Sequence, residues 1–147
     1  NGYIVTAFDL SEAGLEKGKK LAEKCNTYVD FFKADITDFR ATESYDIIFS
    51  SGVFHFIKPE IRKNITQNLK ECTNKSGIHT INVFVDKPFV EVPPEKNTNR
   101  FRWNSGELFT LYHDWKMHKI EEIIFNCNSG GFPHQHCMDI MNAERIQ

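Results

Sequence analysis

The sequence predicts an α/β fold of the Rossmann-like type, in which helices cover both faces of a mostly parallel sheet. The main observation is that β-rich runs alternate with amphipathic helical runs as far as Val85. Such alternation is typical of βαβ units, whose strands are parallel. The second observation is a pair of β-rich runs around Ser129-Gly130-Gly131 near the C-terminus. This pair predicts an antiparallel hairpin at one edge of the sheet.

Length and charge restrict the class of protein. The 147 residues correspond to one domain, and the formal net charge of −2 comes from interspersed charges of both signs, with a pI of about 6.3. This pattern argues against nucleic acid or an acidic membrane as a partner and favours a small molecule. No apolar run reaches membrane-spanning length, and the four scattered cysteines form no CxxC pair. We therefore expect a cytoplasmic protein.

The first βα unit is predicted to have a carboxylate at its turn. Ile4–Phe8 is a short β-rich run that ends at Asp9. Ser11 is suited to cap the following helix, which continues to about Cys25 with apolar residues near one face. A second strand is predicted over Tyr28–Lys33.

The stretch Tyr45–Ile57 is interpreted as a buried strand that stops in small polar residues. Its nearly continuous apolar character is typical of a parallel strand covered on both faces. Ser50, Ser51 and Gly52 lie at its carboxyl end, which is the edge where ligands bind in open α/β sheets. The alternative is that these residues form only a turn between a strand and a loop.

The pattern continues with a helix and a strand and then changes. Pro59 suits the first turn of a helix that stops at Asn74–Gly77, and Ile78–Val85 forms the next strand. Asp86–Asn104 is a long loop with three prolines, and loops of this length are usually functional or mobile.

A short helix and two strands complete the predicted fold. The helix opens at Ser105 and ends at Leu111 or Tyr112. The two hairpin strands follow it and are joined by a turn: Trp115–Phe125, His134–Ala143 and the turn Asn126–Pro133.

Carboxylates at successive strand ends predict a nucleoside-like ligand. Asp9 can accept hydrogen bonds from both hydroxyls of a ribose. One strand later, Ala34-Asp35-Ile36 offers a carboxylate for the exocyclic amine of adenine and an apolar side chain for the ring face, and Phe39 or Phe54 can close the other face. The alternative is that both aspartates are capping or turn residues, and Asp38 offers the same chemistry nearby.

These motifs resemble those of class I S-adenosylmethionine-dependent methyltransferases, and the resemblance covers nearly the whole chain. The segments that carry it are Val5-Thr6-Ala7-Phe8-Asp9-Leu10-Ser11, Ala34-Asp35-Ile36 and Tyr45–Phe56. Within this class, the C-terminal part is similar to the tellurite-resistance methyltransferase group through Glu107-Leu108, Tyr112, Trp115 and Met141-Asn142-Ala143-Glu144-Arg145.

The resemblance implies S-adenosyl-L-methionine as cofactor and a small-molecule methyl acceptor, for example the tellurite or selenite oxyanion or a small metabolite. It also implies cofactor-binding residues in three places. These are Asp9 with Leu10 at the ribose, Asp35 with Ile36 at the adenine, and Ser51 with Gly52 at the methionine part.

One part of the family pattern is absent from this sequence. The family's first strand and glycine-rich loop would precede Asn1, and that strand would lie between the strand that ends at Asp9 and the strand Tyr45–Ile57. Without this strand, backbone N–H and C=O groups of both neighbouring strands lack hydrogen-bond partners. Each buried unsatisfied group costs about 1–3 kcal/mol of stability. We therefore expect residues 1–147 to be one methyltransferase-like domain without its first β-α unit, within a longer polypeptide.

The acceptor side is predicted from imidazole, guanidinium and indole groups. In a methyl transfer, the protein mainly aligns the reactants and excludes water. His55 and His136 are the candidate catalytic residues, and Arg100, Trp103 and His134 are the candidate substrate contacts. The alternatives are that His55 only starts a helix, that Arg100 and Trp103 belong to a solvated basic loop, and that His134 and His136 only pack within a strand.

No metal is expected at the His-Gln-His-Cys motif. His134 and His136 share one face of the predicted strand, whereas Cys137 points to the other face, so only two ligands converge.

Two other functions stay open. A NAD(P)-dependent Rossmann oxidoreductase also has an acidic residue such as Asp9 at a strand end, although Ala34–Ile36 favours methyl transfer. The other is a methyltransferase-like module that binds a metabolite or partner without catalysis.

Overall fold

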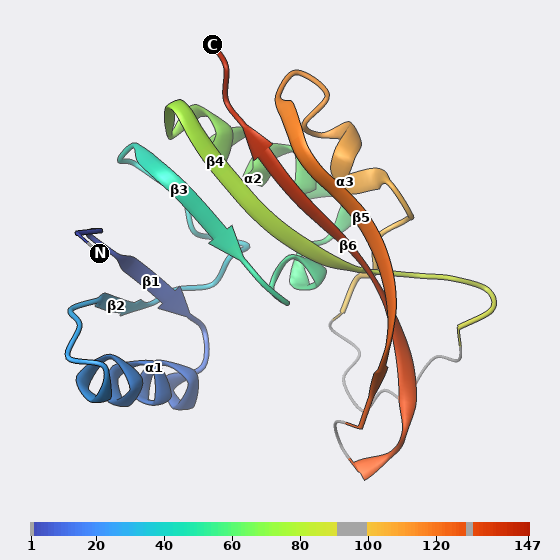
Figure 1. Cartoon of the computed structure of the whole chain (residues 1–147), viewed down its shortest axis with the longest axis horizontal. Coiled ribbons are helices and arrows are strands. Elements are labelled where there is room, and N and C mark those ends of the chain that lie inside the picture. The colour runs from blue at the N-terminus through green and yellow to red at the C-terminus, as the bar shows by residue number, and fades with distance from the viewer. Residues whose placement is uncertain (1, 91–99, 129–130) are drawn as a thin grey trace. The chain divides into compact units, whose positions relative to one another are not determined.

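The computed structural model describes residues 2–90, 100–128 and 131–147 (Figure 1). The chain divides into two compact units, residues 1–39 and residues 40–147. No helix in the described part of the chain has the length and apolar character needed to cross a membrane.

The first unit is a single βαβ unit with a parallel strand pair. Strand β1 (Thr6–Asp9) pairs with β2 (Asp30–Lys33), and helix α1 (Glu12–Lys24) connects them. Ser11 caps the helix as predicted, because its Oγ accepts a hydrogen bond from the backbone N–H of Gly14 at 3.2 Å. A Cβ at Gly18 would lie 2.8 Å from the Phe31 ring, so glycine there permits close packing of the helix on β2.

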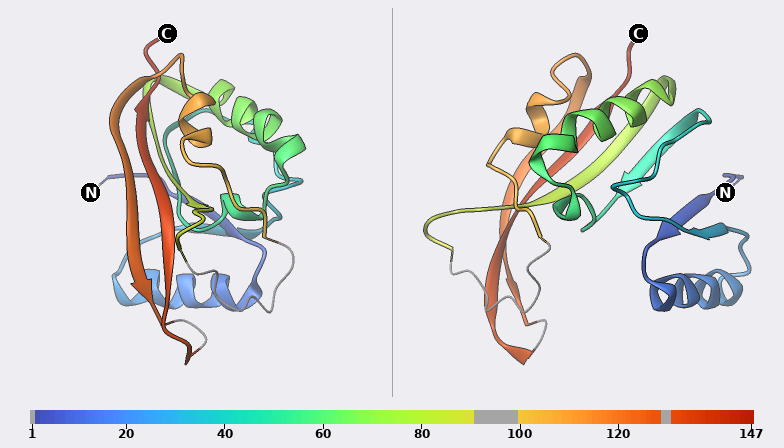
Figure 2. Two further views of the ribbon diagram at one scale, coloured as in Figure 1. Left: turned by 90° about the vertical axis from the view of Figure 1, so that its right-hand side faces the viewer. Right: turned by 180° about the vertical axis from the view of Figure 1, so that it is seen from behind.

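The second unit is a four-stranded sheet with helices on one face. The strand order is β3-β4-β6-β5, with bounds Tyr45–Ser50, Thr73–Val85, His134–Glu144 and Lys116–Cys127. β3 is parallel to β4, and β6 is antiparallel to both β4 and β5. The 3-10 helix η1 (Phe54–Phe56) follows β3. Helices α2 (Pro59–Glu71) and α3 (Glu107–Thr110) lie on the same side of the sheet (Figure 2).

The main fold predictions are confirmed. The chain is a mixed α/β protein with parallel β1–β2 and β3–β4 pairs, Pro59 is at the start of α2, and the C-terminal hairpin is antiparallel. Residues 91–99 of the predicted loop and residues 129–130 of the predicted turn lie outside the described part.

The predicted strand Tyr45–Ile57 is wrong in its end and in its burial. β3 stops at Ser50, because Gly52 takes a left-handed φ of +66° that a strand cannot continue through. Among the described residues, the Phe49 side chain is 70% exposed, so these residues do not cover both faces of β3. Within the described residues, β1 pairs with β2 alone and β3 with β4 alone. The expected additional strand between β1 and β3 stays a prediction.

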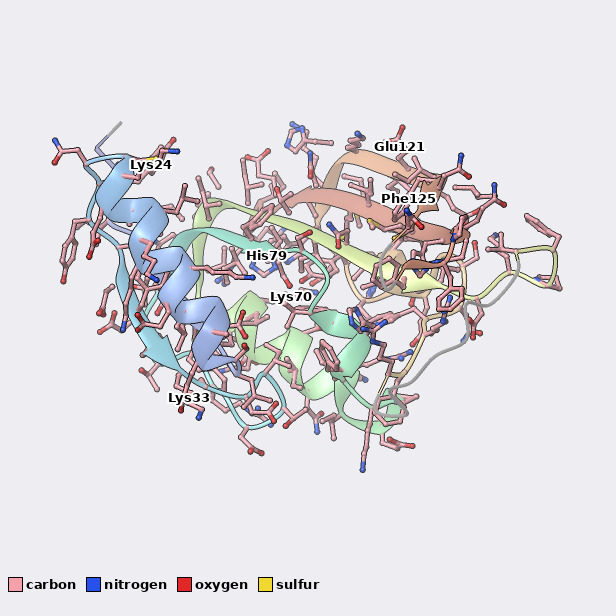
Figure 3. All side chains as sticks on the ribbon, turned by 90° about the horizontal axis from the view of Figure 1, so that it is seen from below. Lys24, Lys33, Lys70, His79, Glu121 and Phe125 are labelled. Atoms are coloured by element: carbon pink, nitrogen blue, oxygen red, sulfur yellow. The ribbon has the colours of Figure 1, made fainter. Side chains whose placement is uncertain are left out.

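A buried hydrogen-bonded histidine lies between the sheet and the helices of the second unit. Thr73 donates its hydroxyl proton to the Leu69 carbonyl at 2.6 Å, so its oxygen accepts from Nε2–H of His79 at 2.7 Å. Nδ1 of His79 then accepts from the Tyr112 hydroxyl at 2.7 Å. Burial raises the pKa of Tyr112 and keeps that proton in place. Lys70 is close to His79 (Figure 3). It also forms an ion pair with Asp114.

Candidate functional site

The two predicted nucleoside-binding aspartates lie at the same edge of the first unit. Asp9 ends β1, and its carbonyl accepts from the Ala34 N–H at 3.3 Å, next to Asp35. Oδ1 of Asp9 accepts from the Ser11 backbone N–H at 2.7 Å, and a Cβ at Gly14 would lie 2.7 Å from Oδ2. The carboxylate therefore rests against the first turn of α1. Its local capping role does not exclude a ligand, because a carboxylate has about four acceptor positions.

Asp35 sits in a local turn of the same kind. Its Oδ1 accepts from both the backbone N–H and the hydroxyl of Thr37, each at 2.8 Å. The apolar neighbours of the two aspartates differ in exposure, because Leu10 is 59% exposed and Ile36 only 8%. Leu10 is thus the more accessible apolar side chain at this edge.

The two phenylalanines predicted to close the adenine site have packing roles. Phe39 packs against Phe8 within the first unit, with ring centroids 4.4 Å apart. Phe54 belongs to the second unit, is 1% exposed and stacks on Trp103 with centroids 6.3 Å apart. The expectation for Phe54 is therefore wrong, since a side chain this deeply buried in the core cannot cover a bound ring.

An asparagine from β4 fixes the turn after β3. The amide of Asn82 accepts from the Gly52 backbone N–H and donates to the Ser51 hydroxyl, both at 2.9 Å. These bonds hold the predicted methionine-side residues in one defined turn. Asn82 was not predicted, although a polar residue within the apolar run Ile78–Val85 is a usable signal.

A small hollow in the second unit brings several of the predicted acceptor-side residues together. It is lined by His55, Phe84, Arg100, Arg102 and His136. The Phe84 ring packs near both imidazoles, with its centroid 5.1 Å from that of His55 and 4.8 Å from that of His136. Cationic and aromatic groups together suit a small anionic or polarisable molecule. The sequence did not predict that Phe84 lines this hollow, because its position in a strand gave no such signal.

Trp103 is a core residue and not an acceptor contact. It is 1% exposed, and its indole N–H donates to the Phe54 carbonyl at 3.1 Å. The guanidinium of Arg62 lies over its ring at 4.1 Å. The prediction for Trp103 is wrong because the end of the long loop returns to the sheet, where Trp103 forms a bridge with Val85. Tyr112 and Trp115 are core aromatics, as expected.

The basic part of the loop is held in place by one buried arginine, Arg62 of α2. Its Nη2 donates to the carbonyls of Phe101 at 2.8 Å and Arg102 at 3.1 Å, and its Nη1 pairs with Glu107 at 2.7 Å. Nε donates to the Ile57 carbonyl at 3.2 Å. Arg62 thereby sets the backbone position of the segment that carries Arg100 and Arg102 into the hollow.

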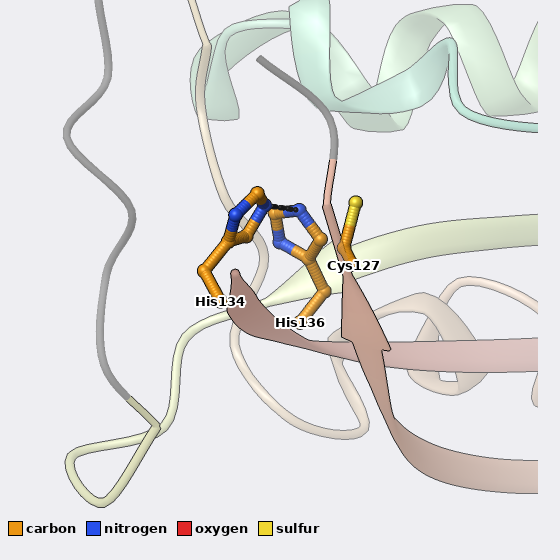
Figure 4. A group of neighbouring side chains, drawn as sticks. All are labelled: Cys127, His134 and His136. Carbon is orange, nitrogen blue, oxygen red and sulfur yellow. Dashed lines mark hydrogen bonds between the residues drawn. The ribbon is translucent and has the colours of Figure 1, made fainter. Parts of the chain in front are cut away.

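The two histidines of β6 converge with a cysteine of β5. Nε2 of His134 and Nε2 of His136 are 2.9 Å apart, and the Cys127 thiol lies on the same side of the hairpin (Figure 4). The ligand atoms of the three residues lie within 4.8 Å of one another. The third donor is Cys127 and not Cys137, because β5 continues to Cys127, two residues beyond the predicted strand end at Phe125.

Comparisons with known proteins agree with the predicted class. A family model described as "Tellurite resistance protein TehB" matches residues 1–130. A curated relative from Haemophilus influenzae (strain ATCC 51907 / DSM 11121 / KW20 / Rd), "Probable S-adenosyl-L-methionine-dependent methyltransferase TehB", is 31% identical over 121 residues. That match covers 82% of this chain and 41% of the relative, so the chain spans less than half of that protein.

Solved structures show the same fold. TehB from Haemophilus influenzae superposes with a TM-score of 0.83 at 27% identity, over 98% of this chain and 50% of that one. The 1,6-didemethyltoxoflavin-N1-methyltransferase of Burkholderia thailandensis, solved with bound 1,6-didemethyltoxoflavin and S-adenosylhomocysteine, has a TM-score of 0.69 at 18% identity. The match covers 99% of this chain and 63% of that enzyme. At this identity the likeness concerns the fold.

Proposed function

Because this chain belongs to the TehB family of tellurite resistance proteins, we propose that it is part of an S-adenosylmethionine-dependent methyltransferase for a small-molecule acceptor. The observation that carries the proposal is the position of Asp9 and Asp35 at one edge of the parallel β1–β2 pair. Ligands bind at this edge in open α/β sheets.

We assign the cofactor contacts by chemistry. Asp9 accepts hydrogen bonds from the ribose hydroxyls and Asp35 from the adenine amine, with Leu10 and Ile36 beside them. The Ser51-Gly52 turn, held by Asn82, binds the methionine part. S-adenosylmethionine supplies the electrophilic methyl group and its leaving group when bound. The residues of this chain position the reactants and exclude water.

The hollow of the second unit is the proposed acceptor site. Arg100 and Arg102 favour an anion, and the imidazoles of His55 and His136 are placed to orient it or to accept a proton. An acceptor with a lone pair on a heavy chalcogen, such as tellurite or selenite, needs no base, whereas a hydroxyl or ammonium acceptor does. The family description makes an oxyanion the first acceptor to test.

Calorimetry on the intact protein tests the cofactor assignment. Saturable binding of S-adenosylhomocysteine without binding of NAD is expected, and Asp9→Ala is expected to weaken it by about 1–3 kcal/mol, since each lost hydrogen bond to a charged group has roughly this value. Asp35→Ala is expected to weaken binding similarly, whereas Asp38→Ala is the matched control and leaves affinity unchanged. Thermal unfolding of each variant separates lost binding from lost fold.

Three other outcomes would contradict parts of the proposal. If the protein binds NAD but not S-adenosylhomocysteine, the proposed methyltransferase is instead an oxidoreductase. Unchanged affinity in Asp9→Ala removes the ribose assignment. Cofactor binding without turnover of tellurite, selenite or a broad panel of small nucleophiles indicates a binding module instead of an enzyme.

A further inference from the structure

The free end of the β5–β6 hairpin places three good metal ligands on one face of a two-stranded ribbon. His134 and His136 are two residues apart on β6, so their side chains point to the same face. Cys127 is directly opposite His134 in the strand register, and directly opposite residues also share a face. Strand geometry alone therefore directs all three side chains to one place, as Figure 4 shows.

The tautomer of the neutral His134 ring is the one that binds a metal through Nε2. Its Nδ1 lies 2.7 Å from the Phe132 carbonyl oxygen, which can only accept, so Nδ1 carries the proton. In the neutral ring, Nε2 then carries no proton, and its lone pair faces Nε2 of His136 at 2.9 Å. A ring nitrogen that donates to a backbone carbonyl while the other faces the ion is the usual arrangement of a metal-binding histidine.

The second imidazole is held in place by aromatic rings. The Phe84 and Phe125 ring centroids lie 4.8 and 5.8 Å from that of His136, and this histidine is 7% exposed. Packing therefore restricts the orientation of the ring before any ligand binds. A preorganised ligand loses little conformational entropy when it coordinates an ion.

The distances are close to those of a tetrahedral zinc site. With Zn–N of ~2.0–2.1 Å and Zn–S of ~2.3 Å, ligand atoms in such a site are roughly 3.3–3.6 Å apart. Here the two nitrogens are 2.9 Å apart, and all three ligand atoms lie within 4.8 Å of one another. Binding of an ion therefore requires the two nitrogens to move apart by a few tenths of an ångström. In the ion-free form, Nε2–H of His136 donates to Nε2 of His134.

We propose that Cys127, His134 and His136 form a binding site for a thiophilic divalent ion of the zinc class. One thiolate and two imidazoles are a ligand set that favours Zn²⁺ over Mg²⁺ or Ca²⁺. Binding releases the thiol proton of Cys127 to solvent, whereas His136 only changes its neutral tautomer. The ion links β5 to β6, and three protein ligands leave its fourth position open to solvent or to a small anion.

Titration of the untagged, metal-free protein with Co²⁺ tests this site. We expect one equivalent of Co²⁺ to produce thiolate-to-cobalt charge-transfer absorption together with the visible bands of tetrahedral cobalt. Added Zn²⁺ is expected to displace the bound Co²⁺ and remove both signals. Cys127→Ser is expected to abolish the charge-transfer absorption. His134→Ala is expected to lower the affinity by ~100-fold or more, since loss of an outer-shell partner alone lowers it 10–100-fold. Both side chains are partly exposed, so the variants retain the fold.

Matched controls use residues of the same type elsewhere. Cys25→Ser and His118→Ala change an exposed cysteine and an exposed histidine and are expected to bind cobalt as the wild type does. Zinc is also expected to raise the Tm of the wild type and of both controls, but not that of Cys127→Ser. The proposal is overturned if no charge-transfer absorption develops, if it persists in Cys127→Ser, or if His134→Ala binds cobalt with unchanged affinity.

Discussion

Replacing Arg62 with leucine is expected to lower the free energy of unfolding by about 2–4 kcal/mol, because its buried guanidinium is lost and the partly buried Glu107 and three backbone carbonyls are left without this donor. The guanidinium is buried and binds Glu107 together with the carbonyls of Ile57, Phe101 and Arg102. Leucine fills much of the space but offers no donor. Urea unfolding monitored by far-UV circular dichroism measures the loss.

Lys63→Leu is the matched control, because Lys63 lies on the exposed face of the same helix. It is expected to change the free energy of unfolding by less than about 0.5 kcal/mol. If Arg62→Leu unfolds at the same urea concentration as the wild type, the hydrogen bonds of Arg62 have no net stabilising role. In that case the position of Arg100 and Arg102 must depend on other contacts.

Acidification from pH 7.5 to pH 5 is expected to cost about 2 kcal/mol of stability through His79 alone. Burial, with a smaller contribution from Lys70, lowers the pKa of His79 to about 3. The unfolded chain therefore binds a proton near pH 6.5 that the folded protein does not accept until much lower pH. The stabilising contribution of the neutral His79 is fully present above pH 6.5 and is lost progressively as the pH falls toward 3.

His79→Gln is the variant that isolates this effect. The glutamine amide can donate to Thr73 and accept from Tyr112, but it does not titrate, so its stability is expected to stay nearly constant between pH 7.5 and pH 5. His113→Gln changes an exposed histidine and is expected to retain the wild-type pH dependence. Urea unfolding at several pH values gives both slopes. Equal slopes for the wild type and His79→Gln would show that another group titrates in this range.

The sequence predicted those elements that depend on capping, hydrophobic spacing and turn residues within one segment. The α1 helix was predicted because Ser11 caps it and its apolar residues recur at helical spacing. The hairpin was predicted because two β-rich runs surround a glycine turn. The end of β3 was not predicted, since the apolar residues Phe54 and Ile57 continue the run but belong to η1 and its cap. An apolar run alone does not distinguish a strand from a buried turn.

The site was predicted where a strand end fixes it and missed where distant segments meet. Asp9 and Asp35 follow directly from the parallel strand order. Trp103 was assigned to the acceptor because no local pattern shows that it bridges to Val85 and packs under Arg62. Cys127 was missed because the hairpin continues past Phe125, and this register is set by pairing along the whole ribbon.

The outer edge of β3 has a consequence for handling the protein at high concentration. Within the described residues, no strand covers this edge, and Ile47 and Phe49 are 48% and 70% exposed. A short apolar strand with unpaired N–H and C=O groups can pair with strands of other chains, and its exposed apolar side chains favour this association. A polypeptide of residues 1–147 alone is therefore expected to self-associate through Tyr45–Ser50, and a further strand at this edge, as expected for the longer polypeptide, or a charged residue at Phe49 would prevent it.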